Sequence, residues 1–293
     1  MDSGGGVSIG RTGGIIALIL MRGQTSELNA RLAQLQNLLS TWRRGLLLFS
    51  GGIDSGLLFH VASNTLGAGL AALTLYGPHN LPRERRAARQ WAQTLGVTLF
   101  EHEFNPLELP DFRDNTSRRC YACKGAMYRL GQQVLSEWGG EVLFDGANRD
   151  DLDDYRPGQQ AARELGVRSP LQEVGFTKAE IRALSRELSL SGWDKPAQSC
   201  LATRFPPNTR LTRTDLEKVA TVEEFLQNQG LALVRLRVHG PLVRLEISPD
   251  EWPRLLAVEL RTSLTELIQR LGWLYLTLDL KGYQTGSMNP EHE

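Results

Sequence analysis

The feature that most constrains the fold is a short apolar run that ends in glycines, Leu46-Leu47-Leu48-Phe49 followed by Ser50-Gly51-Gly52-Ile53-Asp54-Ser55. A continuous apolar run of this length is typical of a strand buried on both faces of a parallel sheet. The residues from Gly56 to Ala62 predict a helix directly after the glycines. Such a turn places unpaired backbone N–H groups and the positive end of a helix beside one anion. The sequence therefore predicts an α/β fold with an anion-binding loop at residues 50–55.

The same alternation of strands and helices continues along the chain. A helix is predicted first, and strands and helices then follow in turn: Glu27–Trp42 before the first strand, then Ala71–Tyr76, Arg83–Leu95, Val97–Phe104, Lys124–Trp138, Val142–Asp145 and Lys178–Leu190. The last helix opens with the spacing of a capping box, from Thr177 to Glu180. Strands that alternate with helices imply a doubly wound parallel sheet covered on both faces.

A second, smaller α+β unit is predicted after Pro206-Pro207. Its expected elements are two helices and three strands: a helix over Thr214–Gln229, two strands around His239-Gly240-Pro241, a helix over Trp252–Leu271 and a strand over Trp273–Leu278. A chain of 293 residues is long enough for two domains. We therefore expect a disordered start at residues 1–24, with Met21 as an alternative initiator, a first domain over residues 25–205, and a C-terminal substrate and oligomerisation domain over residues 206–293.

The composition narrows the class of partners and the compartment. Lys plus Arg and Asp plus Glu both number 33, so no global positive charge favours a nucleic-acid partner. The apolar stretch Ile15–Met21 is too short to span a bilayer, so no membrane partner is expected. Three widely spaced cysteines do not suit a disulfide framework, and a reducing cytoplasm fits them best.

The glycine loop lacks the Gly-Lys-Ser/Thr of a Walker A motif, so transfer of a γ-phosphate is not indicated. Ser-Gly-Gly-x-Asp-Ser resembles the signature of the PP-loop ATP pyrophosphatases, which have the adenine-nucleotide α-hydrolase fold and split ATP into AMP and pyrophosphate. The resemblance implies that Ser50, Gly51, Gly52 and Ser55 hold the pyrophosphate, while Asp54 places a metal ion or the helix start. Gly56 departs from the Ser or Thr often found there. The alternative is a tight turn with a serine cap.

The cysteines form a second constellation. Cys120 and Cys123 lie within reach of one metal ion, and Cys200 lies in a distant loop that can fold back over the carboxyl edge of the sheet. Zinc needs a fourth ligand, whereas a 4Fe-4S cluster held by three thiolates leaves one iron open to carry sulfide. Three unrelated cysteines are the alternative. For the two thiols at the expected helix start, the neighbouring cations Arg118, Arg119 and Lys124 predict lowered pKa values.

Together these motifs resemble the LarE family, ATP-dependent sulfurtransferases that act on pyridinium-3,5-biscarboxylic acid mononucleotide to build the nickel-pincer nucleotide cofactor. The resemblance runs from Leu46 to Met288, and its distinctive segments are Ser50–Ser55, Arg119–Lys124, Asp145–Gly158, Arg168–Leu171, Trp193–Pro196, Cys200–Arg204 and Leu278–Tyr283. It implies that ATP adenylylates a carboxylate of the mononucleotide, pyrophosphate leaves, and sulfur displaces AMP to give a thiocarboxylate. Carboxylate oxygen is a poor leaving group until AMP is attached.

The resemblance also assigns site residues, cofactors and partners. Single-cysteine members sacrifice the sulfur at the position of Cys200, whereas three-cysteine members are thought to use a 4Fe-4S cluster. This chain has Cys120, Cys123 and Cys200, so the cluster type is predicted, together with a small-molecule sulfur donor and a homo-oligomer, a trimer-based hexamer. Further residues are assigned to ligands: Gly146, Asn148, Arg204, Arg235 and Arg237 to nucleotide or substrate phosphate, and Asp150, Asp151 and Glu223 to Mg²⁺. The alternatives for these residues are a solvated acidic loop and a solvated edge strand. Ser199 and Pro207-Asn208 depart from the family pattern.

Two other functions use the same features. A PP-loop tRNA thiolase activates a nucleobase in the same way, but it needs an RNA-binding surface. A non-catalytic carrier of an adenine nucleotide or an iron–sulfur cluster is the second alternative, because nucleotide folds also serve as binding modules. Release of pyrophosphate with the biscarboxylic mononucleotide separates the three functions.

Overall fold

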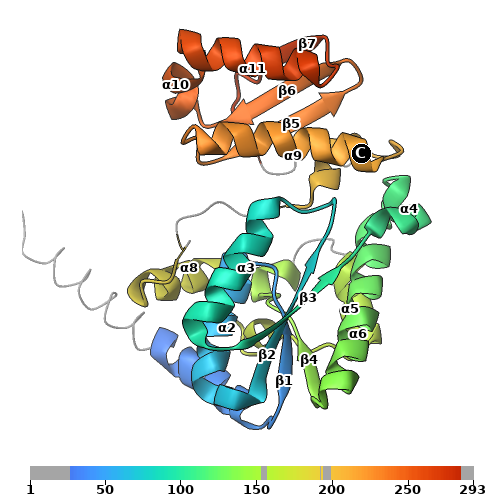
Figure 1. Cartoon of the computed structure of the whole chain (residues 1–293). Coiled ribbons are helices and arrows are strands. Elements are labelled where there is room, and N and C mark those ends of the chain that lie inside the picture. The colour runs from blue at the N-terminus through green and yellow to red at the C-terminus, as the bar shows by residue number, and fades with distance from the viewer. Residues whose placement is uncertain (1–26, 153–156, 192, 194–198, 285–293) are drawn as a thin grey trace, which may run out of the picture.

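A computed structural model of the chain describes residues 27–152, 157–191, 193 and 199–284. The predicted disordered start and the alternative initiator lie outside the described residues, as do parts of two segments on which the family resemblance rests, residues 153–156 and 194–198. The described residues form two sheets (Figure 1), a four-stranded sheet in the first two thirds of the chain and a three-stranded sheet near its end.

The larger sheet is parallel throughout, as predicted. Its strands are β1 Gly45–Leu48, β2 Leu70–Tyr76, β3 Thr98–Glu103 and β4 Val142–Phe144. They lie in the order β3-β2-β1-β4. Leu46 and Leu48 of β1 pack in the core on one face of the sheet, and Leu47 and Phe49 pack in the core on the other. The apolar run of β1 has no polar interruption because both faces of the sheet are buried.

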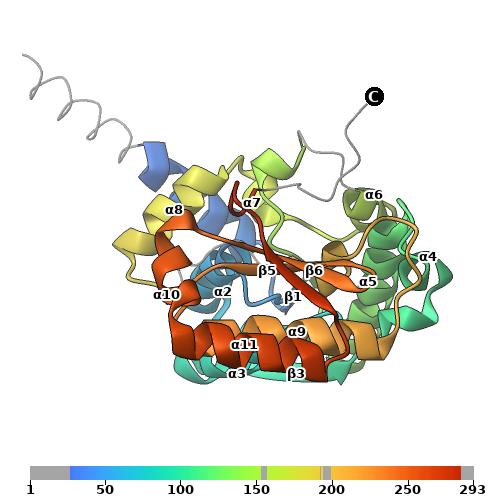
Figure 2. The same ribbon diagram turned by 90° about the horizontal axis from the view of Figure 1, so that it is seen from above.

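Helices cover both faces of this sheet (Figures 1 and 2). The helix over residues 27–40, α2 Ile53–Leu66, α3 Pro82–Leu95 and α8 Lys178–Glu187 share one core with it, and α5 Arg119–Trp138 and α6 Pro157–Glu164 share the other. Short helical segments complete this part of the chain: η1 Gly67–Gly69, η2 Pro106–Glu108, α4 Pro110–Arg113, η3 Arg149–Leu152, α7 Pro170–Glu173 and η4 Leu201–Arg204. The doubly wound parallel fold is confirmed, and it agrees with the PP-loop type.

Two helix starts differ from the sequence predictions in a way that matters for the site. Helix α2 begins at Ile53 rather than Gly56, so half of the glycine loop is already its first turn. Helix α5 begins at Arg119 rather than Lys124, so Cys120 and Cys123 lie inside the helix. The capping box at Thr177 is confirmed, because both of its reciprocal hydrogen bonds to Glu180 are present.

The smaller sheet contains an antiparallel hairpin and one parallel strand. Its elements are α9 Arg213–Asn228, β5 Val234–His239, β6 Leu242–Ile247, η5 Pro249–Glu251, α10 Trp252–Leu256, α11 Val258–Arg270 and β7 Tyr275–Leu278, with the strands in the order β5-β6-β7. The single helix predicted over residues 252–271 is wrong. Ala257 adopts an extended backbone with ψ of 139°, and the break lets Leu255 and Leu264 enter one core.

The two sheets are joined by a shared hydrophobic core. Leu81, Phe112 and Leu201 from the first part of the chain pack in the same core as the buried side chains of α9, β5 and β6. The domain limits at residues 205 and 206 therefore stay a prediction. Within the described residues, no helix combines the length and the apolar character that crossing a membrane requires.

The loops that follow β1, β2 and β4 all leave the carboxyl edge of the parallel sheet, on the side of α9 (Figure 1). The chain runs from β1 to β2 on one side and returns to β4 on the other side of β1. In doubly wound sheets, ligands bind at such a switch point, outside the carboxyl ends of the strands.

Candidate functional site

The glycine loop turns directly from β1 into α2. Gly51 has a φ of 77°, a backbone conformation that favours glycine, and Gly52 is the N-cap of α2. Ser50 Oγ lies 3.1 Å from Ser55 Oγ, and Ser55 Oγ donates to the carbonyl of Gly52 at 3.1 Å. The first turn of α2 leaves backbone N–H groups without helical partners. The predicted loop residues are thus brought together around the start of one helix.

A second glycine fixes this loop from outside. Gly146 follows β4, and a Cβ atom placed there would lie 2.8 Å from the backbone N and Cα of Ser55. Only glycine permits this approach, so the loops after β1 and β4 are in direct backbone contact. Gly56, where the PP-loop pattern often has Ser or Thr, would place a Cβ 3.3 Å from the ring of Trp91. The packing of Trp91 accounts for that departure.

Asp54 has an incomplete set of partners. Its Oδ2 accepts a hydrogen bond from Asn148 Nδ2 at 3.1 Å, but among the described residues no donor reaches its buried Oδ1. Burial raises the pKa of Asp54, and the neighbouring Asp151 adds to the effect against the opposing charge of Lys178. A hard cation that prefers carboxylate oxygen would supply the missing partner.

The other predicted magnesium residues of this edge shape the loop. Asp150 is exposed, and its Oδ2 accepts from the backbone N–H of Lys178 at the start of α8. Asp151 is buried, and its Oδ2 accepts from the backbone N–H of Asn148 at 3.0 Å. In the part of the chain that the structure describes, no group of three or more His, Cys, Asp or Glu is placed to hold a metal ion.

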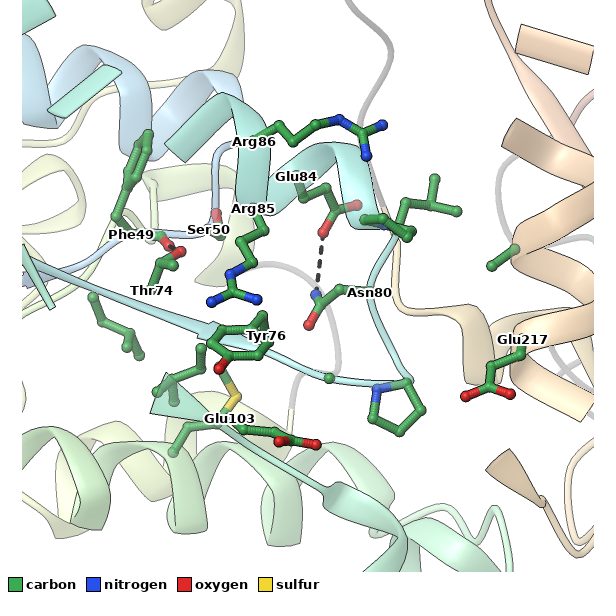
Figure 3. Close-up of a pocket in the computed structure, with 18 of the residues that line it drawn as sticks. Phe49, Ser50, Thr74, Tyr76, Asn80, Glu84, Arg85, Arg86, Glu103 and Glu217 are labelled. Atoms are coloured by element: carbon green, nitrogen blue, oxygen red, sulfur yellow. Dashed lines mark hydrogen bonds between the residues drawn. The ribbon is translucent and has the colours of Figure 1, made fainter. Parts of the chain in front are cut away.

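A cavity of about 520 Å³ opens beside the glycine loop (Figure 3). Its wall runs from Phe49 and Ser50 along the end of β2 to the start of α3, and Glu217 of α9 lies on the far side. Cavities of about 300 to 1,000 Å³ are usual for small-molecule sites. Asn80 Nδ2 donates to Glu84 Oε2 at 3.1 Å on this wall. Sequence reasoning missed both residues, although their position after the second parallel strand was a usable signal.

The thiols come from two elements. Cys120 and Cys123 lie in the first two turns of α5, and Cys200 is the residue before η4. Cys120 and Cys200 both raise the pKa of Cys123, and Cys120 raises that of Cys200, so the three lie within electrostatic range. The predicted lowering of thiol pKa values is wrong for Cys123. Burial raises the pKa of Cys123, and it raises the pKa of Cys200 to about 11, because a buried thiolate loses hydration.

Arg204 fixes the segment that carries Cys200. The guanidinium is fully buried and forms two bonds with Glu223, Nε to Oε1 at 2.8 Å and Nη2 to Oε2 at 2.9 Å. Its Nη1 reaches the carbonyl of Cys200 at 3.2 Å, the carbonyl and hydroxyl of Ser199, and the hydroxyl of Thr203. In this arrangement Arg204 and Glu223, predicted to contact phosphate and metal, bond to each other and to protein.

The two predicted arginines of β5 lie on one strand face, as their spacing indicated. Arg237 pairs with Glu246 at 2.8 Å and also donates to the carbonyl of Thr203. Arg235 donates to the carbonyl of Val234. Both arginines are buried rather than solvated. Burial, together with the positive charge of Arg204, lowers the pKa of Arg235 to about 10.

Comparison with known proteins places this geometry in a family. No family model matches the chain. An uncharacterized protein of Synechocystis sp. is 38% identical over 262 residues, which are 89% of this chain and 98% of that protein. The pyridinium-3,5-bisthiocarboxylic acid mononucleotide synthase of Lactiplantibacillus plantarum is 33% identical over 265 residues, 90% of this chain and 95% of the synthase. The chain belongs to the LarE family.

The family resemblance read from the motifs is therefore confirmed, but this match does not extend to the three-cysteine cluster type. A more distant match, an uncharacterized protein of Methanocaldococcus jannaschii, is 27% identical over 208 residues, 70% of this chain and 78% of that protein. Within this LarE-family chain, the structure joins Ser50–Ser55, Gly146 and Asn148 at one sheet edge. It joins Cys200, Arg204, Glu223 and Arg237 above that edge.

Proposed function

We propose that this protein is an ATP-dependent sulfur insertase that acts on pyridinium-3,5-biscarboxylic acid mononucleotide. A carboxylate oxygen of the substrate attacks the α-phosphorus of ATP, a C–O–P linkage forms, and pyrophosphate leaves with the electron pair of the broken P–O bond. A sulfur nucleophile then attacks the activated carbonyl carbon, and AMP leaves with the C–O electron pair. The product is a thiocarboxylate. The Lactiplantibacillus plantarum relative is a pyridinium-3,5-bisthiocarboxylic acid mononucleotide synthase, which supports this substrate class.

The glycine loop beside the 520 Å³ cavity carries the proposal. Ser50 lines that cavity and also contacts Ser55 in the loop. The anion site at the start of α2 therefore adjoins the cavity, and one nucleotide could fill both. The loop residues would hold the pyrophosphate portion of ATP. This position leaves the α-phosphate next to the cavity, where a carboxylate can approach it.

Magnesium fits the loop as a partly hydrated ion. Mg²⁺ is usually held by one or two carboxylates together with phosphate oxygens and water, rather than by a full set of protein ligands. Asp54 offers one buried oxygen without a hydrogen-bond partner among the described residues, with Asn148 next to it. Bound there, the ion would neutralise phosphate charge.

The sulfur source is the part of the proposal with two routes. Thiol chemistry suits iron, but as placed in the described residues Cys120, Cys123 and Cys200 do not form a metal-binding set. The 4Fe-4S cluster remains a proposed cofactor, and neither the adenylylation nor the displacement of AMP requires it. In the other route Cys200 itself gives up sulfur. Its carbonyl and its neighbours are held by Arg204, which fixes the backbone on which a nucleophile has to be positioned.

Incubation with MgATP and the biscarboxylic mononucleotide tests the proposed function. We expect AMP, pyrophosphate and the mass gain of an oxygen-to-sulfur exchange in the mononucleotide. Pyrophosphate release with tRNA instead would support the thiolase, and nucleotide binding without pyrophosphate release would support a carrier. Iron and sulfide analysis of anaerobically purified protein, set against the mass of the Cys200 peptide after turnover, separates the two sulfur routes. The oligomeric state, proposed as a trimer-based hexamer, is measured by light scattering in the same sample.

A further inference from the structure

The carboxyl group of Glu84 is the acid of the cavity nearest to the glycine loop. Glu84 lies in the first turn of α3, and its backbone carbonyl oxygen is 3.6 Å from the position of a Cβ on Gly51. The side chain lines the cavity (Figure 3). A nucleotide whose phosphates occupy the loop therefore has its next portion, the sugar, at the level of Glu84.

Glu84 has unused acceptor capacity. A carboxyl group offers about four lone-pair positions; one takes Asn80 Nδ2 at 3.1 Å, and the backbone of Leu81 supplies a further hydrogen bond. Among the described residues Glu84 forms no ion pair, although the charges of Arg83 and Arg204 act on it from α3 and η4. Burial outweighs both charges and raises the pKa of Glu84 to about 7. A buried carboxyl group with free acceptor positions is stabilised by a hydrogen bond from a neutral donor.

Asn80 holds this carboxyl group and is itself incomplete. Its Nδ2 is used by Glu84, whereas no donor from the described residues reaches its buried Oδ1. A buried acceptor without a partner costs about 1–3 kcal/mol. The pair thus presents acceptors and lacks donors. The two adjacent hydroxyls of a ribose are neutral donors that match these acceptors.

The rest of the cavity suits the base rather than the sugar. Apolar side chains, among them Leu75, Leu81 and Met127, also line the cavity. The cations Arg85 and Arg86 are already paired with Glu101 and Glu224. A cavity that combines acceptors beside the loop with apolar surface suits the phosphates, ribose and base of a nucleotide.

We propose that Glu84, held by Asn80, accepts a hydrogen bond from a ribose hydroxyl of the bound nucleotide and makes the cavity select ribonucleotides over deoxyribonucleotides. This inference rests on the proposed function, because it takes ATP as the occupant of the cavity. Glu84 is a specificity-determining residue here, and Asn80 is a positioning residue that acts through it.

Calorimetric titration of the full chain with ATP, 2′-deoxy-ATP, 3′-deoxy-ATP and purine riboside triphosphate tests the inference. A hydrogen bond to a charged group corresponds to about a tenfold to hundredfold change in affinity. We expect one deoxy analogue to bind the wild type that much more weakly than ATP, and purine riboside triphosphate to bind like ATP. Glu84→Ala should reduce the affinity for ATP to that for the deoxy analogue. Asn80→Ala should lower the ratio of the affinity for ATP to that for the deoxy analogue.

Glu108→Gln is the matched control, because Glu108 accepts from Asn105 Nδ2 at 3.1 Å in the same way as Glu84 from Asn80 but is not among the residues that line the cavity, so it should keep the wild-type ratio of affinities for ATP and the deoxy analogue. Glu84→Gln guards against a folding defect in the alanine variant. Equal binding of ATP and both deoxy analogues overturns the inference and leaves the proposed function intact. A Glu84-dependent loss with purine riboside triphosphate also overturns it, since the carboxyl group then reads the base amine. Absence of any nucleotide binding by the wild type overturns the proposed function itself.

Discussion

Replacing Arg204 with methionine should destabilise the protein more than any change at a surface ion pair. Arg204 and Glu223 are both 0% exposed, and the change removes two bonds from Glu223, which within the described residues keeps the bond from the backbone N–H of Leu236 at 2.9 Å. Removal of one partner from a buried pair costs about 3–5 kcal/mol, because the remaining charge stays desolvated. We expect Arg204→Met to lower the free energy of unfolding in urea by that amount.

The cause of this loss is tested by a second change in the same pair. Glu223→Gln removes the stranded charge and can still accept the N–H of Leu236, so Arg204→Met/Glu223→Gln should be more stable than Arg204→Met alone. The control is Arg89→Met, since Arg89 is half exposed and its partner Glu101 keeps Arg85; we expect a change within about 1 kcal/mol. A double variant less stable than Arg204→Met, or a loss below the control, refutes the reasoning.

The same variant should change the chemistry of the cysteine segment. Arg204 Nη1 holds the hydroxyls of Ser199 and Thr203 and the carbonyl of Cys200, so its loss frees the backbone on both sides of the thiol. We expect faster alkylation of Cys200 in Arg204→Met than in the wild type at neutral pH, measured by peptide mass. An unchanged alkylation rate would mean that the segment is held by other contacts.

Three further predictions concern single positions. Gly146→Ala places a Cβ 2.8 Å from the backbone of Ser55, so it should lower the free energy of unfolding in urea by about 1–3 kcal/mol and weaken ATP binding. The control is Gly125→Ala, whose Cβ would have its nearest atoms 3.6 Å away and which should stabilise α5 by up to about 1 kcal/mol. Equal effects of the two variants would contradict the contact between Gly146 and Ser55. Glu84 has a pKa of about 7 in the folded chain against 4.5 unfolded, so the wild type loses stability as the pH rises between these values. Glu84→Gln should therefore gain on the wild type through this window, by about 2–3 kcal/mol at pH 8, and parallel stability curves would contradict the raised pKa. Thr177→Ala removes the N-cap of α8 and should lower the unfolding free energy by about 1 kcal/mol, measured by urea or thermal unfolding.

Most of the fold followed from local signals. The continuous apolar run of β1 and the capping box at Thr177 are encoded within a few residues, and both were confirmed. The break at Ala257 was not foreseeable in the same way. The leucines on either side of the break, Leu255 and Leu264, pack in one core, and such tertiary packing can override helix propensity.

The same contrast between local sequence signals and tertiary contacts applies to the site. The loop at residues 50–55 was found from sequence because strand, glycines and helix follow one another directly. The roles of Arg204 and Glu223 could not be read in this way, since their contacts join residues from separate elements. The predicted acidity of the thiols at the helix start was wrong for Cys123 for a related reason. Lys124 does lower the pKa of Cys123, but burial, which no sequence spacing reports, is the larger effect.

The unequal attachment of the cysteine segment has a mechanical consequence. On one side the backbone N–H of Leu201 makes a single bond to the carbonyl of His79, in the loop after β2. On the other side the guanidinium of Arg204 clamps the segment to Glu223 of α9. The position of Cys200 therefore depends more on α9 than on the loop after β2, so a shift of α9 relative to the parallel sheet would carry the Cys200 backbone with it.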